Sequence, residues 1–227
     1  MNTVYLVRHA ENPANITKEF SCRKVDYPLT QKGILQAQQT AVYFRDERID
    51  AIYSSPLKRA VQTAEIIGNA LDLPVTVIEH FREMNVGDLE DGPPTLENWA
   101  FHDRIVATWL QGSYTVAFPG GEDYLTLLDR MRAGLTTALR GREDQRIVIV
   151  GHGGIFTATI GALCPNASLP EILRHPSHNC SVSIMEMEHA TNELVGTLRS
   201  WASCDHISGD AADFVFATPT ESTRQAR

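Results

Sequence analysis

Three stretches of the sequence place arginine or histidine side chains at, or a few residues after, the end of an apolar run. Arg8 and His9 follow the run YLV, and His152 follows RIVIVG. Arg59 comes shortly after a third run, IDAIYS. Arginine is costly to bury unless it is paired, so these positions indicate a polar pocket at the ends of buried strands.

The residue types in this pocket favour an anionic ligand over a metal ion. Two arginines beside the histidines would repel a cation, whereas guanidinium groups bind phosphate oxygens through two parallel hydrogen bonds. A helix that starts with Ser55 as N-cap and Pro56 at its first position would add backbone N–H donors and the positive end of its dipole. The glycines of GHGG, which begins at Gly151, let the backbone approach a ligand closely.

Most catalytic signatures for phosphate esters are absent from the sequence. It contains no GxxxxGK[ST] loop, no cysteine and arginine at the spacing of the cysteine phosphatases, no DxD motif and no GxSxG elbow. A histidine nucleophile remains, because neutral imidazole is available near neutral pH and could form a phosphohistidine. The leaving group would need a proton from a carboxylic acid. The candidates are Glu11, Glu83, Asp88, Glu90 and Glu122, with Glu83 slightly favoured because it follows the third predicted strand directly.

Short apolar runs alternate with stretches of helical periodicity along the chain. Strands are predicted at residues 3–7, 49–54, 74–79 and 146–150, with a closing pair at 181–188 and 193–201. Helices are predicted after Thr30, from Ser55, and at 96–110, 124–139 and 155–163, and residues 11–29 are predicted to be irregular. The alternation indicates an α/β sandwich with a mainly parallel sheet, in which ligands bind at the carboxyl ends of the strands.

The chain has 227 residues, of which 43% are hydrophobic, and a net charge of −8. We expect one domain over residues 1–207, with an insertion or lid at 79–120, and a peripheral or flexible tail at 208–227. The acidic charge argues against general binding of nucleic acid. With no apolar run long enough for a bilayer and no signal-peptide pattern, we expect a cytoplasmic protein that does not bind membranes. The four scattered cysteines indicate free thiols, with neither a zinc site nor a disulfide framework.

Taken together, the motifs resemble the histidine phosphatase superfamily, also called the phosphoglycerate mutase-like family. The matching stretches LVRHAEN, DYPLTQKGILQAQ, IYSSPLKRAVQTAEII, REMNVGDLEDG, PGGEDY, IVIVGHGG and NCSVSI occur in the family's order and span nearly all of residues 3–200. The resemblance implies a three-layer α/β/α sandwich with a mainly parallel central sheet. It also implies a small phosphorylated substrate and no metal or organic cofactor, and it makes a homodimer plausible.

The resemblance also assigns roles to individual residues. His9 would be the phosphorylated nucleophile, and Glu83 the proton donor and acceptor. The phosphoryl group would be bound by Arg8, Asn15, Ser21, Arg59 and His152.

Three positions depart from the family's pattern. Ala10 stands where the family usually has glycine, and Cys22 stands where the mutases usually have glycine. PGGED replaces the commoner PxGES, which leaves the role of Glu122 open.

The sequence after Glu83 resembles the phosphatase branch, whereas cofactor-dependent mutases have RHYG there and a longer insertion before the PxGES turn. We therefore expect a metal-independent phosphohydrolase of the histidine acid-phosphatase type that cleaves a phosphomonoester of a small metabolite. The alternatives are a cofactor-dependent phosphoglycerate mutase and a non-catalytic phospholigand sensor. The lid should determine the substrate. Candidates for lining it, whose helical spacing favours ordinary core packing, are Trp99, Phe101, His102, Arg104 and Trp109.

Overall fold

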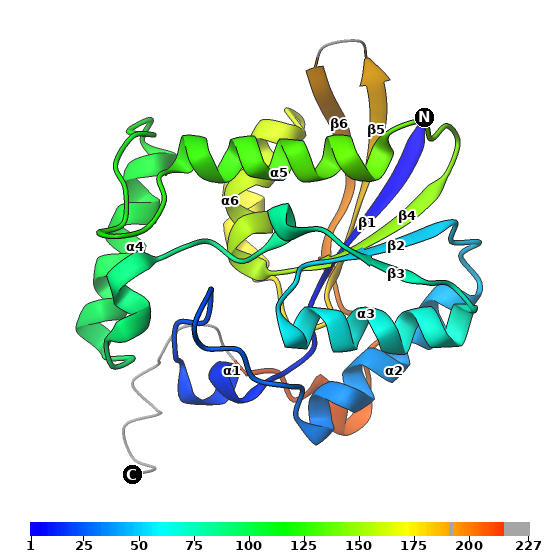
Figure 1. The fold of residues 1–227 in the computed structure, drawn as a ribbon, viewed down its shortest axis with the longest axis horizontal. Coiled ribbons are helices and arrows are strands. Elements are labelled where there is room, and N and C mark those ends of the chain that lie inside the picture. Colours follow the sequence, from blue (N-terminus) through cyan, green and yellow to red (C-terminus); the bar gives the residue numbers. More distant parts are fainter. Residues whose placement is uncertain (191–192, 216–227) are drawn as a thin grey trace.

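The centre of the fold is a six-stranded sheet in the computed structural model, which describes residues 1–190 and 193–215 (Figure 1). Its strand order is β3-β2-β4-β1-β5-β6. Four strands run parallel, and two form an antiparallel pair at one edge. The parallel strands are β1 (Asn2–Arg8), β2 (Ala51–Ser54), β3 (Val75–Val77) and β4 (Arg146–Gly151), and the edge pair is β5 (Val182–Ala190) and β6 (Glu193–Ser203).

Helices cover both faces of this sheet. Alternate residues of β1 lie in two apolar clusters, as expected for a strand whose side chains point to opposite faces. One cluster includes α2 (Gln31–Arg45) and α3 (Lys58–Leu71), and the other includes α5 (Tyr124–Leu139) and α6 (Gly153–Leu163). The predicted α/β/α sandwich with a mainly parallel sheet is confirmed.

The register of the central strands brings their carboxyl ends together. Arg8 pairs with Gly151, and Ser54 pairs with Val150. The residues that follow these strands therefore meet at one edge of the sheet, as the strand-end argument predicts.

The predicted start of the helix after β2 is wrong. α3 begins at Lys58, and the chain from Ser55 to Leu57 precedes it, with Leu57 as an extended N-cap residue that provides no side-chain cap. Asp26 Oδ1 accepts the Lys58 N–H at 2.8 Å, so a distant loop satisfies this helix start. Ser55 Oγ accepts the Leu57 N–H at 3.4 Å and has a second partner, described below.

A short helix, α1 (Pro13–Thr17), lies where the sequence was expected to be irregular. Asn12 caps it, and the side chains of Asn12 and Asn15 each accept a hydrogen bond from the other's backbone N–H. Proline at the first helical position fits this start. With only five residues, α1 is too short to show an apolar periodicity, so the capping pattern is its only sequence signal.

The predicted insertion contains two short 3₁₀ helices, η1 (Glu79–Phe81) and η2 (Gly87–Asp91), and the α-helix α4 (Leu96–Leu110). Figure 1 shows α4, in green, to one side of the sheet. A further short helix, α7 (Leu169–Arg174), follows α6. In the part of the chain that the structure describes, no helix has the length and apolarity needed to cross a bilayer.

The chain beyond Ser208 begins with η3 (Gly209–Ala212), which packs on α2. Ala211 is buried there, and its carbonyl accepts a hydrogen bond from Gln36 Nε2 at 3.0 Å. Residues 216–227 of the predicted tail lie outside the described residues. The domain boundary at residue 207 stays a prediction.

Candidate active site

Arg59 connects the two histidines at the carboxyl edge of the sheet. Its Nε donates to His9 Nε2 at 3.0 Å, and its Nη2 donates to His152 Nδ1 at 3.1 Å. The two imidazole rings lie 5.1 Å apart, and all three side chains are buried. The structure therefore brings together residues that are far apart in the sequence around one guanidinium group.

These contacts define the tautomer of each histidine, because arginine can only donate. His9 Nε2 must accept from Arg59, so its Nδ1 carries the proton and donates to the Ala10 carbonyl at 2.8 Å. His152 Nδ1 also accepts from Arg59, so its Nε2 donates to Ser55 Oγ at 2.7 Å. The Nε2 lone pair of His9 thus lies at the centre of the site.

Both histidines are held neutral by their surroundings. Burial, followed by the positive charges of Arg59 and Arg8, places the pKa of His9 well below its usual range. Burial and Arg59 act on the pKa of His152 in the same direction. Burial also lowers the pKa of Arg59, to about 10, which leaves the guanidinium charged at neutral pH. The site therefore combines neutral imidazoles with a fixed positive charge.

Arg8 supplies a second buried guanidinium with unused donor capacity. Its Nη1 donates to the Ser177 carbonyl, while its Nε is buried without a hydrogen-bond partner among the described residues. Burial lowers the pKa of Arg8, so the charged form lacks full compensation in this state. An unsatisfied buried cation is costly, and a bound anion would compensate it.

Glu83 reaches the same region from the segment after η1. Its carboxylate accepts the N–H groups of Met84 at 2.8 Å, Ile155 at 2.9 Å and Gly154 at 3.2 Å. A Cβ at Gly154 would lie only 2.7 Å from Glu83 Oε1, so the second glycine of the GHGG motif makes room for this carboxylate. Of the five carboxylates considered as proton donors from the sequence, Glu83 alone lines the cavity at this site.

The Glu83 segment is held by an ion pair between the partly buried Arg130 and the buried Glu122. Arg130 of α5 bonds both oxygens of Glu122, at 2.7 and 2.9 Å, and donates to the carbonyls of His80, Arg82 and Glu83. Glu122 in turn accepts the Asn85 N–H at 2.7 Å. Glu122 of PGGED thus positions the backbone around Glu83 and does not line the cavity.

A second carboxylate, Glu90 of η2, fixes the entrance loop, residues 21–25. Its Oε1 accepts four consecutive backbone N–H groups, from Cys22 to Val25, at 2.8 to 3.1 Å. Ser21, at the start of this loop, accepts from Arg59 through both its Oγ, at 2.8 Å, and its carbonyl, at 2.6 Å. Glu90 therefore holds Arg59 in place through the loop.

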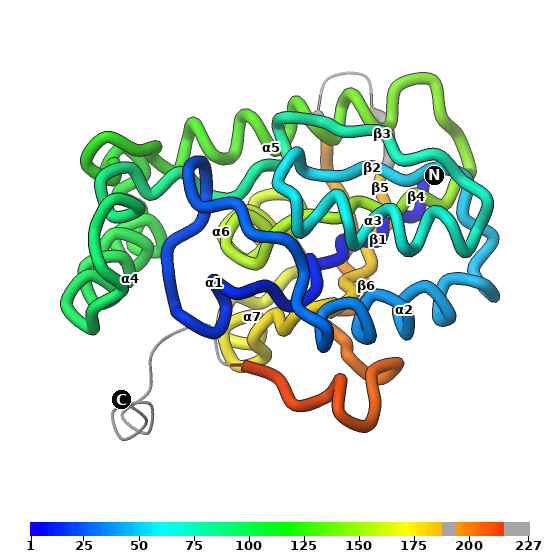
Figure 2. The backbone as a smooth tube through the Cα atoms, turned by 60° about the horizontal axis from the view of Figure 1, so that its bottom comes forward, coloured from blue at the N-terminus to red at the C-terminus, as the bar shows by residue number. Residues whose placement is uncertain are grey.

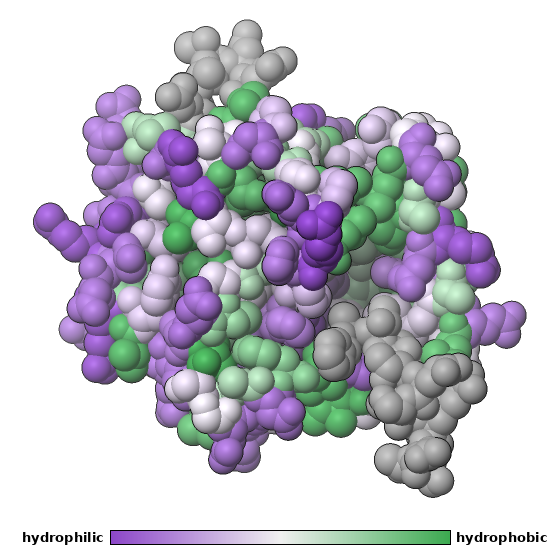
Figure 3. Space-filling model, turned by 180° about the vertical axis from the view of Figure 1, so that it is seen from behind, coloured by the Kyte–Doolittle hydropathy of each residue, from purple (hydrophilic) through white to green (hydrophobic). Residues whose placement is uncertain are grey.

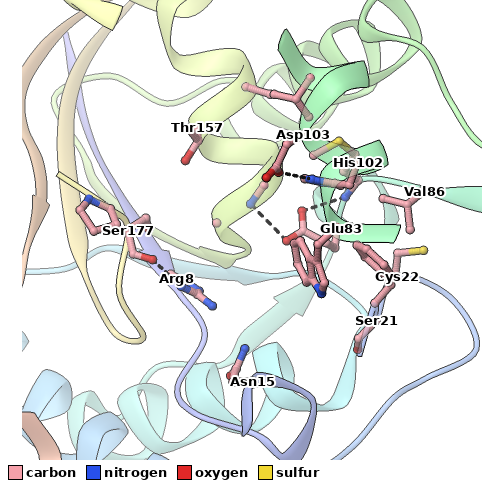
Figure 4. A pocket seen from close by; sticks show the side chains of 18 of the residues that line it. Arg8, Asn15, Ser21, Cys22, Glu83, Val86, His102, Asp103, Thr157 and Ser177 are labelled. Atoms are coloured by element: carbon pink, nitrogen blue, oxygen red, sulfur yellow. Dashed lines mark hydrogen bonds and ion pairs between the residues drawn. The ribbon is translucent and has the colours of Figure 1, made fainter. Parts of the chain in front are cut away.

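The two remaining predicted site residues, Asn15 and Ser21, lie in the same region as the histidines. Two further residues, Asn179 and Thr63, contact this region and were not predicted. Asn15 and Ser21 both line the cavity (Figure 4). Asn179 donates to the His9 carbonyl at 2.9 Å and to Asn15 Oδ1 at 3.1 Å. Its only sequence signal is its place in NCSVSI. Thr63 Oγ1 accepts the Ala10 N–H at 3.0 Å, which nothing in the sequence indicates.

The two small-residue departures fit the structure without strain. Ala10 is fully buried in an apolar cluster with Ala37 and Ala211, and its φ is not positive, so the position does not require glycine. Cys22 lines the cavity, where its Sγ lies 3.2 Å from Glu90 Oε2. Burial raises the pKa of this thiol to about 12, so it is an unreactive wall residue.

The site opens into a cavity of about 410 Å³. Arg8, Asn15, Ser21 and Glu83 are among the side chains around it in Figure 4. Of the proposed lid residues, Trp99 and His102 line the cavity, whereas Trp109 is buried in the core. Within residues 1–190 and 193–215, no group of three or more His, Cys, Asp or Glu side chains is placed to hold a metal ion.

Arg8, His9 and Arg59 line this cavity, and His152 contacts Arg59 without lining it. A model of the histidine phosphatase superfamily (branch 1) matches residues 4–198. The chain belongs to this superfamily.

Relatives of this histidine phosphatase chain carry different activity names. It is 34% identical over 161 residues to "Uncharacterized phosphatase PhoE" of Bacillus subtilis, covering 70% of this chain and 76% of that protein. It is 33% identical over 193 residues to "Probable phosphoglycerate mutase GpmB" of Proteus mirabilis, covering 84% and 87%. The solved structure of a phosphoserine phosphatase mutant from Entamoeba histolytica, in complex with phosphoserine, is 26% identical with a TM-score of 0.74, covering 92% and 100%.

The lowered pKa values of the two buried histidines make stability depend on pH. Below about pH 6.5 the unfolded chain binds protons on these residues while the folded chain does not. The free energy of unfolding therefore falls as the pH drops below 6.5, by up to about 1.4 kcal/mol per pH unit for each histidine. The full contribution of the two neutral histidines to stability is present above about pH 6.5. Urea denaturation in phosphate-free buffers between pH 7.5 and 5.5 measures this loss. His9→Ala should make the decline shallower, and an unchanged slope would contradict the assignment to His9.

Proposed function

We propose that the chain is a phosphomonoester phosphatase that acts through a phosphohistidine at His9 Nε2 on a small phosphorylated metabolite. The observation that carries the proposal is the hydrogen bond from Arg59 Nε to this atom. The bond supports the proposal because it leaves Nε2 of a buried, neutral imidazole unprotonated and because a guanidinium, a group suited to phosphate oxygens, lies next to it.

In the first step, substrate oxygens take over the donors that Arg59 now directs to the histidines, and Arg8 Nε gains a partner. The His9 Nε2 lone pair attacks phosphorus as the bond to the ester oxygen breaks, and Glu83 gives its proton to the departing alkoxide. In the second step, water attacks phosphorus, passes a proton to the Glu83 carboxylate and releases His9 with inorganic phosphate. Arg8 and Arg59, with Asn15 and Ser21 nearby, stabilise the phosphoryl oxygens, and His152 joins them once the bound anion favours a proton on its Nδ1.

All groups in these steps belong to the chain, so we propose that turnover needs neither a metal nor a cofactor. Incubation with p-nitrophenyl phosphate and with 3-phosphoglycerate in the presence of EDTA should release inorganic phosphate, with His9→Ala as the blank. Loss of activity with EDTA that added metal restores would contradict this mechanism.

A phosphoglycerate mutase is the second candidate, because the Proteus mirabilis relative carries that name. The same incubation distinguishes the two activities. Formation of 2-phosphoglycerate from 3-phosphoglycerate, especially after priming with 2,3-bisphosphoglycerate, would identify a mutase. We expect phosphate release without this isomer, because the residues after Glu83, Met84 to Val86, provide no cation for a glycerate carboxylate.

Glu83→Gln should separate the two proton transfers. p-Nitrophenolate leaves without a proton, so the variant should show a burst of p-nitrophenol close to one per enzyme, followed by slow turnover. Alkyl phosphates need the acid in the first step, and their turnover should fall by roughly 10²–10⁴-fold with no burst. Stopped-flow absorbance and phosphate release measure both effects. Glu97→Gln, on an exposed part of α4, is the matched control. Equal slowing for all leaving groups without a burst would mean that another group is the acid.

A further inference from the structure

The cavity that His9 and Glu83 line extends to α4 and α7, and both helices contribute side chains to its lining. Figure 2 shows α1 and the loop after it beside α4. Trp99 of α4 donates its indole N–H to the Lys18 carbonyl in that loop at 3.0 Å. This wall is built largely from apolar side chains. Those from the two helices are Val106 and Leu110 of α4, and Leu169, Ile172 and Leu173 of α7.

Two leucines at this end of the cavity are exposed. Leu110 is 40% and Leu173 is 55% exposed, although both line the cavity. Seen from behind, the molecule has a hollow bordered partly by hydrophobic side chains (Figure 3). Exposed apolar surface that lines a cavity gains free energy when an apolar ligand covers it.

Aromatic rings supply a flat surface in the same cavity. The rings of Phe20 and Trp99 stack at 4.4 Å with an interplanar angle of 30°. Because the indole N–H already bonds the Lys18 carbonyl, Trp99 has no polar donor left for a ligand. These rings can therefore offer only apolar and π contacts.

The charges around the cavity are divided between its two ends. Arg8 and Arg59 lie at the phosphate end, and Lys18, which also lines the cavity, belongs to the loop that contacts Trp99. No arginine or lysine of α4 or α7 lines the cavity among the described residues. The additional carboxylates in the lining are Glu19 and Asp103. A second anionic group on the substrate would face repulsion there.

We propose that the part of the cavity lined by α4 and α7 is a leaving-group subsite for hydrophobic alcohols, so that the substrate is a monophosphate ester of an alkyl or aryl alcohol. The inference rests on the proposed function, since the phosphate must be held by the arginines for the leaving group to enter this space. It also explains why the acidic residues do not oppose binding: the only anionic part of such a substrate lies at the basic end.

The test is a series of substrates that differ only in chain length. The value of kcat/KM should rise about threefold per added CH₂, so that hexyl phosphate exceeds ethyl phosphate by roughly 80-fold. The kcat/KM for 1-naphthyl phosphate should also be higher than the values for 3-phosphoglycerate and phosphocholine. A flat series, or a preference for 3-phosphoglycerate or for phosphocholine, would overturn the inference and leave the phosphatase assignment intact.

Variants locate the effect in the proposed subsite. Leu173→Ser on α7 and, independently, Leu110→Ser on α4 should each lower the ratio of hexyl to ethyl phosphate kcat/KM by about 3–10-fold. Leu35→Ser on α2, where the side chain is 47% exposed and outside the cavity, is the matched control. If the ratio of hexyl to ethyl phosphate kcat/KM is unchanged in both variants, the subsite does not lie between α4 and α7.

A binding measurement separates failure of the subsite from failure of the catalytic assignment. Alkylphosphonates cannot be hydrolysed, so calorimetric titration of the unmodified protein with ethyl- and hexylphosphonate reports the subsite without turnover. Hexylphosphonate should bind at least tenfold more tightly. Equal affinities would overturn the subsite, whereas chain-length-dependent binding without hydrolysis of any ester would overturn the proposed function alone.

Discussion

Replacing His9 with alanine should reduce hydrolysis of p-nitrophenyl phosphate by about four orders of magnitude or more, because the reaction loses its nucleophile. The arginines and His152 remain, so phosphate should still bind to the variant. In the unmodified protein, rapid acid-free quenching should trap a phosphate group that is labile to acid and stable to base, as expected for a phosphohistidine. Mass spectrometry of the quenched protein should place it on His9.

Two controls make this result specific. His175→Ala removes an exposed imidazole outside the cavity and should leave the rate unchanged. His152→Ala should slow the reaction but retain the label on His9, because His152 contacts Arg59 and is not the residue that bonds phosphorus in this proposal. A label that persists in His9→Ala and disappears in His152→Ala would reverse the two roles.

Arg59→Lys should have the second largest effect, lowering kcat/KM by roughly 10²–10³-fold although the charge is kept. One ammonium group cannot replace a fork that contacts His9, His152 and Ser21 at the same time. Competitive inhibition by vanadate should weaken together with catalysis. Arg104→Lys, on α4 and outside the cavity, is the control with the same exchange of side chains. Near-normal kcat/KM in Arg59→Lys would show that charge alone is sufficient at this position.

The sequence predicted the strand ends well because their signals are local. The apolar runs before Arg8, Ser54 and His152 are short and sharply bounded, and parallel pairing alone brings their ends together. The ranges of α4 and α5 were also correct, because both helices have a capping residue and a clear apolar periodicity. In contrast, the helix start at Ser55 was wrong, since a distant group, Asp26, caps Lys58.

The supporting contacts of the candidate site could not be predicted, because they join residues far apart in the chain. Glu90 and Glu122 were considered as proton donors, and nothing in their local sequence shows that backbone N–H groups and Arg130 occupy them. The lid residues show the same limit. Trp99 and Trp109 share one helix, yet only Trp99 lines the cavity, because the loop after α1 lies on its side of α4.

Because Glu90 binds the backbone of the entrance loop, substitutions of Glu90 and substitutions of the loop's side chains should have different consequences. Glu90 Oε1 contacts only main-chain N–H groups, so the side chains of Arg23, Lys24 and Val25 play no part in those bonds. None of these three side chains lines the cavity, so substitutions there should leave the backbone donors, Ser21 and Arg59 in place. The conformation of the loop therefore depends on Glu90 more than on the side chains of residues 23–25, so the sequence there can change while the machinery that cleaves the ester is retained.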